Sequence, residues 1–274
     1  MTSSQHRKMT KTNTFLTMGC LTIAMLTACS HIDEDERLIY VEPANAQRVV
    51  LVEDFTGQKC INCPNATDIL HDIMTAYGEA NIIPVAIHCG PYGLTTAAGL
   101  VTEAGKTYWE TFFSDTQGQP VAKINRGAAN DDYKNYWAKA IACELSRPTN
   151  VTLNVKASYM EEGRQLQVDI SALGTAGENH ELQLWLLEDS IVAIQSLPTG
   201  GTDRQYVHNH VLREALNGNW GEPITFAEDT VRIQKHYTIN EKYKAKDCYL
   251  VAFTYNGNGV TQAARTKAFA TEDE

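Results

Sequence analysis

The sequence predicts an α/β layer followed by an all-β sandwich. Residues 47–146 alternate apolar, strand-like runs with helix-like stretches, which is typical of a parallel sheet covered by helices. From residue 151 onward, apolar and polar residues alternate with a period of two, as in strands buried on one face. A Cys-x-x-Cys pair, Cys60 and Cys63, stands between the first strand and the first helix, in the order that a βαβ unit requires. We therefore expect two domains, residues 47–146 and 147–274.

Residues 1–28 are predicted to be an export signal. Three basic side chains precede an apolar run, Phe15–Leu26, that is too short to span a bilayer. The run ends in Leu-Thr-Ala-Cys, which resembles the bacterial lipobox, whose cysteine becomes the lipidated first residue of the mature protein. An ordinary signal peptide with a coincidental cysteine is the alternative. A lipid on Cys29 would anchor the chain to a membrane without a transmembrane helix.

An acidic tether, residues 29–46, follows the lipobox. Its acidic run, Asp33–Glu36, resembles the signal behind the lipidated cysteine of surface-exposed Bacteroidetes lipoproteins, although such charge is usually a solvated spacer. The whole chain has 23 Lys and Arg against 33 Asp and Glu, a net charge of -10, and the leader holds three of the basic residues. The mature protein is therefore acidic, and we expect no nucleic-acid partner because a phosphate backbone would be repelled.

The first domain is expected to contain three buried strands and three helical segments. In chain order these are Val49–Phe55, Ala66–Tyr77, Ile82–His88, Pro91–Asp115, Pro120–Arg126 and Asp131–Leu145. The fourth is long for a connection and rich in aromatic residues, so it is interpreted as an inserted helical segment that could wall the thiol site. The last is expected to turn Tyr133, Tyr136, Trp137, Ala140 and Ile141 inward.

The second domain is expected to contain seven short strands in a β-sandwich. They are Val151–Ala157, Leu166–Ile170, Leu182–Leu187, Ile191–Gln195, Val231–Ile239, Tyr249–Tyr255 and Val260–Ala268, separated by turn residues. Between them, Leu197–Pro223 is polar and Gly-rich and contains HNHVLREALNG and NWGEP. A loop of this length is usually functional or disordered, and its Trp and Leu residues favour a packed excursion.

The Cys-Ile-Asn-Cys pair is the candidate reactive site. Two thiols one helical turn apart can close a small disulfide loop, and a helix amino terminus would stabilise the first as a thiolate. Cys60 is therefore the candidate nucleophile and Cys63 the resolving thiol. Half of a zinc site and a purely structural disulfide are the alternatives; no second Cys pair or paired His follows at zinc-finger spacing. We predict no metal and no cofactor.

The surroundings of this pair resemble thioredoxin over residues 47–146. Asp54-Phe55 stands six residues before Cys60, in the place of the buried Asp-Phe of thioredoxins, and Gln119-Pro120 stands where that fold has its cis proline. The resemblance implies that Asp54 lies under the disulfide, with a raised pKa, and accepts the proton of Cys63. It also implies that Pro120 presents the backbone of Gln119 to an extended peptide. A solvated strand-end acid and a trans proline are the alternatives.

Two departures from the thioredoxin pattern count against general dithiol exchange. Lys59 replaces the aromatic residue that usually precedes the first cysteine, and Thr56 replaces a second aromatic residue after Asp-Phe. These changes remove the flat apolar surface on which thioredoxins dock substrate chains. A Lys beside Cys60 would favour the thiolate electrostatically, unless solvent screens its charge.

Other cysteine and histidine residues provide weaker candidates. Cys89 closes the second strand and is expected near Cys60, because that end of the strand lies on the same edge of the sheet as the Cys pair. Cys143, on the inner side of a helix, and Cys248 are expected to be small buried side chains. His208 and His210 could share a metal only with a third ligand, for which His180 and His236 are candidates. Isolated histidines are more often surface or network groups, so metal binding is not favoured. Hydrolase and nucleotide-binding motifs are absent.

Taken together, the lipobox, the acidic tether, FTGQKCINCP, HNHVLREALNG and NWGEP resemble the Bacteroidetes outer-membrane lipoprotein family named for a twenty-eight-kilodalton surface protein. That family is described as a surface adhesin or receptor, and it implies a thioredoxin-like domain followed by an immunoglobulin-like sandwich. The first hypothesis is a lipid-anchored binding, adhesion or receptor module of the outer membrane, displayed at the cell surface, with surface ligands as partners. The periplasmic face of that membrane is the alternative position. The alternative is a membrane-tethered thiol-disulfide oxidoreductase that acts on exported proteins through Cys60 and Cys63.

Overall fold

The computed structural model describes residues 48–113 and 117–269. The predicted signal peptide, Cys29 and the acidic tether lie outside these residues. The helices are α1 (Cys63–Tyr77), α2 (Glu103–Phe112) and α3 (Trp137–Leu145). The strands are β1 (Val50–Thr56), β2 (Ile82–His88), β3 (Val121–Ile124), β4 (Ala129–Asn130), β5 (Thr152–Met160), β6 (Gln165–Leu173), β7 (Asn179–Glu188), β8 (Ile191–Ser196), β9 (Thr202–His208), β10 (Val211–Ala215), β11 (Glu222–Thr225), β12 (Val231–Thr238), β13 (Cys248–Asn256) and β14 (Gly259–Lys267). An α/β region followed by a β region is therefore confirmed.

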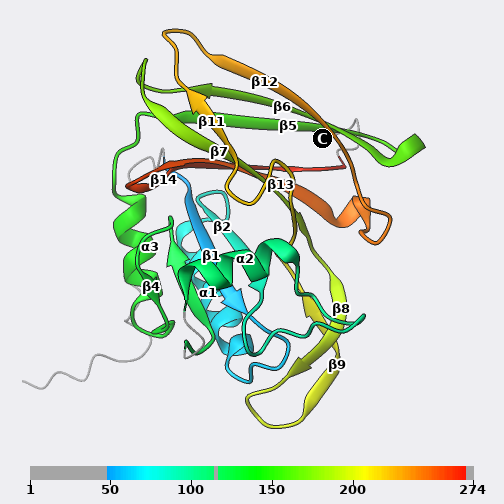
Figure 1. The fold of residues 1–274 in the computed structure, drawn as a ribbon. Coiled ribbons are helices and arrows are strands. Elements are labelled where there is room, and N and C mark those ends of the chain that lie inside the picture. Colours follow the sequence, from blue (N-terminus) through cyan, green and yellow to red (C-terminus); the bar gives the residue numbers. More distant parts are fainter. Residues whose placement is uncertain (1–47, 114–116, 270–274) are drawn as a thin grey trace, which may run out of the picture. The chain divides into compact units, whose positions relative to one another are not determined.

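One mixed sheet runs through both regions (Figure 1). Its strand order is β14-β13-β7-β10-β2-β1-β3-β4, and β11 pairs with β7 outside this path. β1 is parallel to β2 and antiparallel to β3. β10 joins the two regions, because Val211 pairs with Ala86 of β2 on one side and with Glu188 of β7 on the other. Strands from residues 147–274 thus continue the sheet that β1 and β2 begin.

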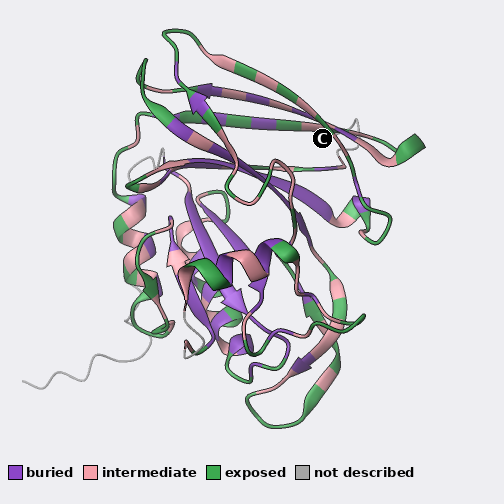
Figure 2. Ribbon diagram, in the orientation of Figure 1, coloured by how far each residue is buried: buried purple, intermediate pink, exposed green. Residues whose placement is uncertain are grey.

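β1 is buried along its whole length, because helices cover both of its faces (Figure 2). Val50 and Val52 pack into a core with apolar side chains of α1 and α3. Leu51 and Phe55 point to the opposite face and pack with α2. Successive side chains of a strand alternate between faces. The same alternation therefore sends the two acidic residues of β1, Glu53 and Asp54, to opposite sides of the sheet.

A second, three-stranded sheet, β12-β6-β5, packs on the other part of the large sheet. β7 belongs to both cores: Leu184 and Leu186 face the three-stranded sheet, whereas Trp185 and Leu187 face the core beneath α2. This double burial explains why the second half of β7, from Leu184 to Leu187, is a continuous apolar run rather than an alternating one. Within the residues described, no helix has the length and apolar character needed to cross a membrane.

The expectation of a long loop at Leu197–Pro223 is wrong, because this segment contains β9, β10 and the start of β11. β9 pairs with β8 in a separate two-stranded hairpin whose side chains are mostly accessible to solvent. Its sequence, TDRQYVH, therefore lacks the alternation that marks a half-buried strand. In β10, an irregularity between Leu212 and Glu214 interrupts the period of two.

The expected helix at Asp131–Leu145 is wrong at its start, because α3 begins only at Trp137. Side chains bind the preceding backbone: Asn130 accepts a hydrogen bond from the Asp132 amide at 2.8 Å, and Asp132 accepts one from the Asn135 amide at 3.1 Å. Such local bonds compete with helical hydrogen bonds. Trp137 and Ile141 are buried as expected, whereas Tyr136 is exposed.

Candidate functional site

Cys60 and Cys63 form a disulfide at the amino terminus of α1. Cys63 is the first residue of the helix, and the proline that follows it suits this position because its missing amide proton has no helical acceptor there. The relative exposures of Cys60 and Cys63 are only 3% and 2%. The predicted pairing is thus formed, and both of its sulfur atoms are almost inaccessible to solvent.

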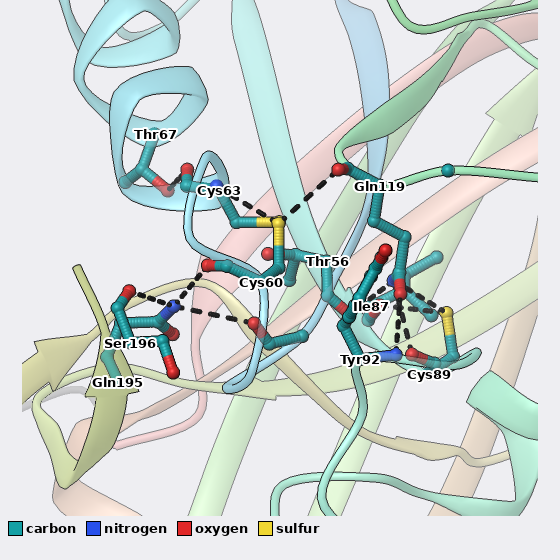
Figure 3. Close-up of a disulfide and its surroundings, with 12 residues drawn as sticks. Thr56, Cys60, Cys63, Thr67, Ile87, Cys89, Tyr92, Gln119, Gln195 and Ser196 are labelled. Carbon is teal, nitrogen blue, oxygen red and sulfur yellow. Dashed lines mark hydrogen bonds between the residues drawn. A yellow bond between two sulfur atoms is a disulfide. The ribbon is translucent and has the colours of Figure 1, made fainter. Parts of the chain in front are cut away.

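The groups around the sulfur atom of Cys60 favour a negative charge on that atom. The amide of Cys63 donates a hydrogen bond to the Sγ of Cys60 at 3.1 Å, and the first turn of α1 contains no acidic side chain (Figure 3). An amide donor and the positive end of a helix dipole both stabilise an anion. After reduction, Cys60 would therefore be the better stabilised thiolate of the two.

Gln119 faces the disulfide from the opposite side (Figure 3). The Gln119–Pro120 peptide bond is cis, and the carbonyl oxygen of Gln119 lies 3.4 Å from the Sγ of Cys60. The side-chain amide of Gln119 donates to the carbonyl oxygens of Thr56, at 2.8 Å, and Cys89, at 3.1 Å. These bonds hold the start of β3 against the ends of β1 and β2.

Asp54 lies on the face of β1 that α1 covers, and its relative exposure is 4%. Burial raises the pKa of its carboxyl to about 7, and its Oδ1 has no hydrogen-bond partner. A buried carboxyl without a partner favours its neutral form because the charged form loses hydration. Asp54 is therefore a group that can exchange a proton near neutral pH.

The two residues that replace docking aromatics have backbone roles. The amide of Lys59, whose side chain is exposed, donates to the carbonyl of Tyr92 at 2.9 Å. Thr56 is buried, and its carbonyl accepts hydrogen bonds from the Cys89 amide and from the Gln119 side chain. Both residues help to fix the loop that carries Cys60.

A hairpin from the second region also covers this loop, which the sequence did not indicate. Gln195 of β8 is buried, and its side-chain amide donates to the carbonyl of Cys60 at 2.9 Å. The amide of Ser196 donates to the carbonyl of Gln58 at 2.9 Å. The side chain of Gln58 is also buried; it donates to the Ile194 carbonyl and accepts from the Leu100 amide. The disulfide loop is thus held by segments more than 100 residues apart in the chain.

The three remaining described cysteines are free. Cys89 is buried near Gln119, with 3.9 Å between its Sγ and the Gln119 Nε2, and burial raises the pKa of its thiol well above the ordinary value. Cys248 is buried as expected, and burial raises its pKa to about 12. The expectation for Cys143 is wrong: it is exposed on α3, because the buried positions of this helix are Trp137, Ile141 and Leu145.

His208 and His210 do not converge. His208 packs against His88, with 5.1 Å between the ring centroids, and burial lowers the pKa of His208 to about 4. The Nδ1 of His210 instead lies 2.8 Å from the hydroxyl of Tyr249.

The two candidate third ligands lie elsewhere. His180 forms hydrogen bonds with Asn256 and Thr261, and His236 is exposed on β12. Within the described ranges, no three His, Cys, Asp or Glu side chains form a group able to hold a metal ion.

Glu53 forms a second buried polar group on the opposite face of β1. Its Oε1 lies 3.4 Å from the Nε of Arg126, and the exposures of the two side chains are 0% and 7%. The guanidinium of Arg126 lies 4.0 Å from the ring centroid of Tyr255 and 4.9 Å from that of Phe253. Trp220, from NWGEP, also contacts this cluster. The sequence did not indicate this ion pair, because both charges belong to segments expected to be strands.

Comparisons with known proteins agree with this architecture. The sequence model of a protein family described as outer membrane protein Omp28 matches residues 106–271. Among solved structures, HBP35 of Porphyromonas gingivalis aligns with a TM-score of 0.64 and 17% identity, covering 83% of this chain and 78% of that chain. At this identity the similarity concerns the fold alone.

A second solved structure has much lower similarity. The X-ray structure of Northeast Structural Genomics Consortium target SoR45 aligns with a TM-score of 0.21 and 14% identity, covering 45% of this chain and 89% of that chain. This similarity is too low to bear on the fold. No curated protein matches the sequence.

Proposed function

Because this chain belongs to the Omp28 family of outer membrane proteins, we propose that it is a lipid-anchored binding module displayed on that membrane. The proposed anchor is a lipid on Cys29, the cysteine of the lipobox-like sequence. The acidic tether that follows would separate the folded part from the bilayer. Its acidic run also supports display at the cell surface, by its resemblance to the signal of surface-exposed lipoproteins.

Protease treatment of intact cells tests the proposed display. We expect the protein to be digested while a soluble periplasmic protein in the same cells survives. A Cys29→Ala variant should no longer fractionate with membranes, because it lacks the acceptor for the lipid. Full protection in intact cells, followed by digestion after lysis, would place the folded part on the periplasmic side and contradict surface display.

We assign a thioredoxin-like fold to the α/β region and an immunoglobulin-like sandwich to the β region. The support for the first is the β1-α1-β2 unit, antiparallel β3 beside β1, and the disulfide at the start of α1. The support for the second is the packing of the β12-β6-β5 sheet on β7 and β13. The sheet that both regions share would fix their relative orientation.

The observation that carries the binding proposal is that other parts of the protein cover the Cys60–Cys63 disulfide. Both sulfur atoms are buried, and the β8–β9 hairpin bonds to the loop through Gln195 and Ser196. Thiol-disulfide exchange needs access of an attacking thiolate to a sulfur atom. A covered disulfide is suited to stabilising a loop rather than to turnover, so we interpret the α/β region as a scaffold for ligand binding.

A thiol-disulfide oxidoreductase is the second candidate, favoured by Asp54 and by the amide donor to Cys60. In this reaction, the Cys60 thiolate attacks a substrate disulfide, forms a mixed disulfide and releases one substrate thiolate. The Cys63 thiol then loses its proton to the Asp54 carboxylate and attacks the Sγ of Cys60. The second substrate thiolate leaves, so the substrate is reduced and Cys60–Cys63 is oxidised.

The reduction potential of the Cys60–Cys63 disulfide discriminates between the two candidates. For a structural disulfide we expect a value below about -300 mV, measured by equilibration with dithiothreitol buffers. We also expect a Cys63→Ser variant to accumulate no mixed disulfides through Cys60 in cells. A value near -200 mV, or substrates trapped by Cys63→Ser and lost in Cys60→Ser/Cys63→Ser, would instead establish the oxidoreductase.

A further inference from the structure

A cavity of about 320 Å³ lies beside Asp54. Its walls are formed by α1, by β2 and by the chain from Tyr206 to His210, which leads from β9 into β10. Cavities of this size accommodate small organic molecules. The site is therefore bounded by elements of both regions, and the shared sheet holds them together.

The inner part of the cavity is apolar except for one carboxyl group. Leu70, Met74 and Pro84 line it and are buried, and the carboxyl of Asp54 lies among the lining groups. Asp54 is more than nine-tenths buried, and its Oδ1 lacks a hydrogen-bond partner. Leaving a buried polar atom unpaired costs free energy, because the atom loses its hydrogen bonds to water. A ligand that brings a hydrogen-bond donor to this atom would recover that cost.

The charged side chains of the lining determine which kind of hydrogen-bond donor a ligand should bring to the cavity. Asp68, on the exposed side of α1, supplies a second carboxylate, and none of the lining residues is Lys or Arg. Burial raises the pKa of the Tyr206 hydroxyl, and the nearby charge of Asp68 raises it further. His210 is already paired, with its Nδ1 3.3 Å from the Oδ1 of Asp189. The lining also includes the imidazole of His71, and Arg265 acts on His210 from outside the lining, but the carboxyl groups of Asp54 and Asp68 favour a cation over an anion.

We propose that this cavity binds a small organic cation, a protonated primary amine whose ammonium group donates a hydrogen bond to Asp54. A short aliphatic chain would pack on Leu70, Met74 and Pro84, where burial of apolar surface adds affinity. Thr67 and Tyr206 provide polar groups that orient the ligand. The inference rests on the proposed binding function, for which it names a class of ligand.

Titration of the full chain with n-butylamine at pH 8 tests the proposal. At this pH the amine is protonated and Asp54 is mostly ionised. The readout is the ¹³C shift of the Asp54 carboxyl together with calorimetry. We expect saturable binding of n-butylamine and none of sodium butyrate or n-butanol, which match its chain length but lack the cation. Absence of saturable n-butylamine binding, or equal binding of n-butanol, would overturn the site.

Two substitutions test whether n-butylamine binds in this cavity. Asp54→Asn keeps the side-chain shape and should weaken n-butylamine binding at least tenfold, whereas Asp72→Asn, an exposed change on α1, should leave it unchanged. Val207→Lys places an ammonium group at the exposed mouth and should also weaken binding at least tenfold. Leu173→Lys adds the same charge at an exposed position outside the lining and is its matched control.

The outcomes separate this inference from the proposed function. Variants Asp54→Asn and Val207→Lys that bind n-butylamine as tightly as the unmodified chain would overturn the assignment of the cavity. A disulfide as resistant to reduction as a structural one in the same protein would still support the binding module. Conversely, n-butylamine binding that depends on Asp54, in a protein whose disulfide cycles, would retain the amine site and contradict the scaffold interpretation.

Discussion

Replacing Asp54 with asparagine is expected to raise the free energy of unfolding at pH 8 by roughly 2–4 kcal/mol. Burial raises the pKa of this carboxyl from 3.8 to about 7 in the folded protein, so above pH 7 the native state holds a desolvated charge. Asparagine has a similar shape and no charge. The gain is reduced by the cost of the buried amide, which needs its own hydrogen bonds.

The sign of the pH dependence provides a second check on Asp54. Between pH 3.8 and about 7, the folded state keeps a proton that the unfolded chain has lost. The contribution of Asp54 therefore makes the unmodified protein less stable as pH rises through this range. The stability gain from Asp54→Asn should be small near pH 4 and reach its full size above pH 7.

Urea unfolding of both proteins at a series of pH values measures this difference. The matched control is Asp72→Asn, an exposed change on α1 for which we expect a shift within about 0.5 kcal/mol at every pH. A stability difference between the Asp54 variant and the unmodified protein that does not vary with pH would contradict the assigned burial effect.

Replacing Arg126 with alanine is expected to lower the free energy of unfolding by about 3–5 kcal/mol. Glu53 is fully buried, and its carboxylate forms an ion pair with the guanidinium of Arg126. Burial raises the pKa of Glu53, and the charge of Arg126 opposes that rise. Removing the guanidinium would leave the carboxylate unpaired and would also remove the cation that packs on Tyr255.

A double-mutant cycle separates the ion pair from the packing. Glu53→Gln in the Arg126→Ala background should recover part of the lost stability, because a neutral amide costs less to bury than an unpaired carboxylate. Arg204→Ala, an exposed change on β9, is the matched control and should alter stability by less than about 0.5 kcal/mol. A loss below about 1 kcal/mol for Arg126→Ala would contradict this prediction. It would mean that water or a rearranged side chain replaces the guanidinium as the partner of the Glu53 carboxylate.

Local chemistry was enough to predict the centre of the candidate site. The spacing of Cys60 and Cys63 places the two sulfur atoms one helical turn apart, and the structure joins them at the start of α1. The strand-helix-strand order around them follows from periodicity within single segments. The thioredoxin resemblance predicts a cis proline at Gln119-Pro120; this peptide bond is cis, and the Gln119 carbonyl lies against Cys60.

Features that depend on pairing between distant segments were not predictable in this way. β9 carries polar side chains on both faces, so only its pairing with β8 makes it a strand. Gln195 contacts Cys60 across 135 residues, a contact that no local pattern encodes. The burial of the Glu53–Arg126 ion pair depends on the elements that cover both faces of β1, which come from other parts of the chain.

The sequence by itself determined the two regions, the disulfide pair and the acidic character of the chain, because each depends on neighbouring residues or on composition. Only the tertiary structure decided that both regions share one sheet and that the β8–β9 hairpin covers the disulfide loop. It also decided that Asp54 lines a cavity while its neighbour Glu53 faces the opposite core. The physical reason is that burial and charge pairing arise from contacts between segments, which local periodicity does not specify.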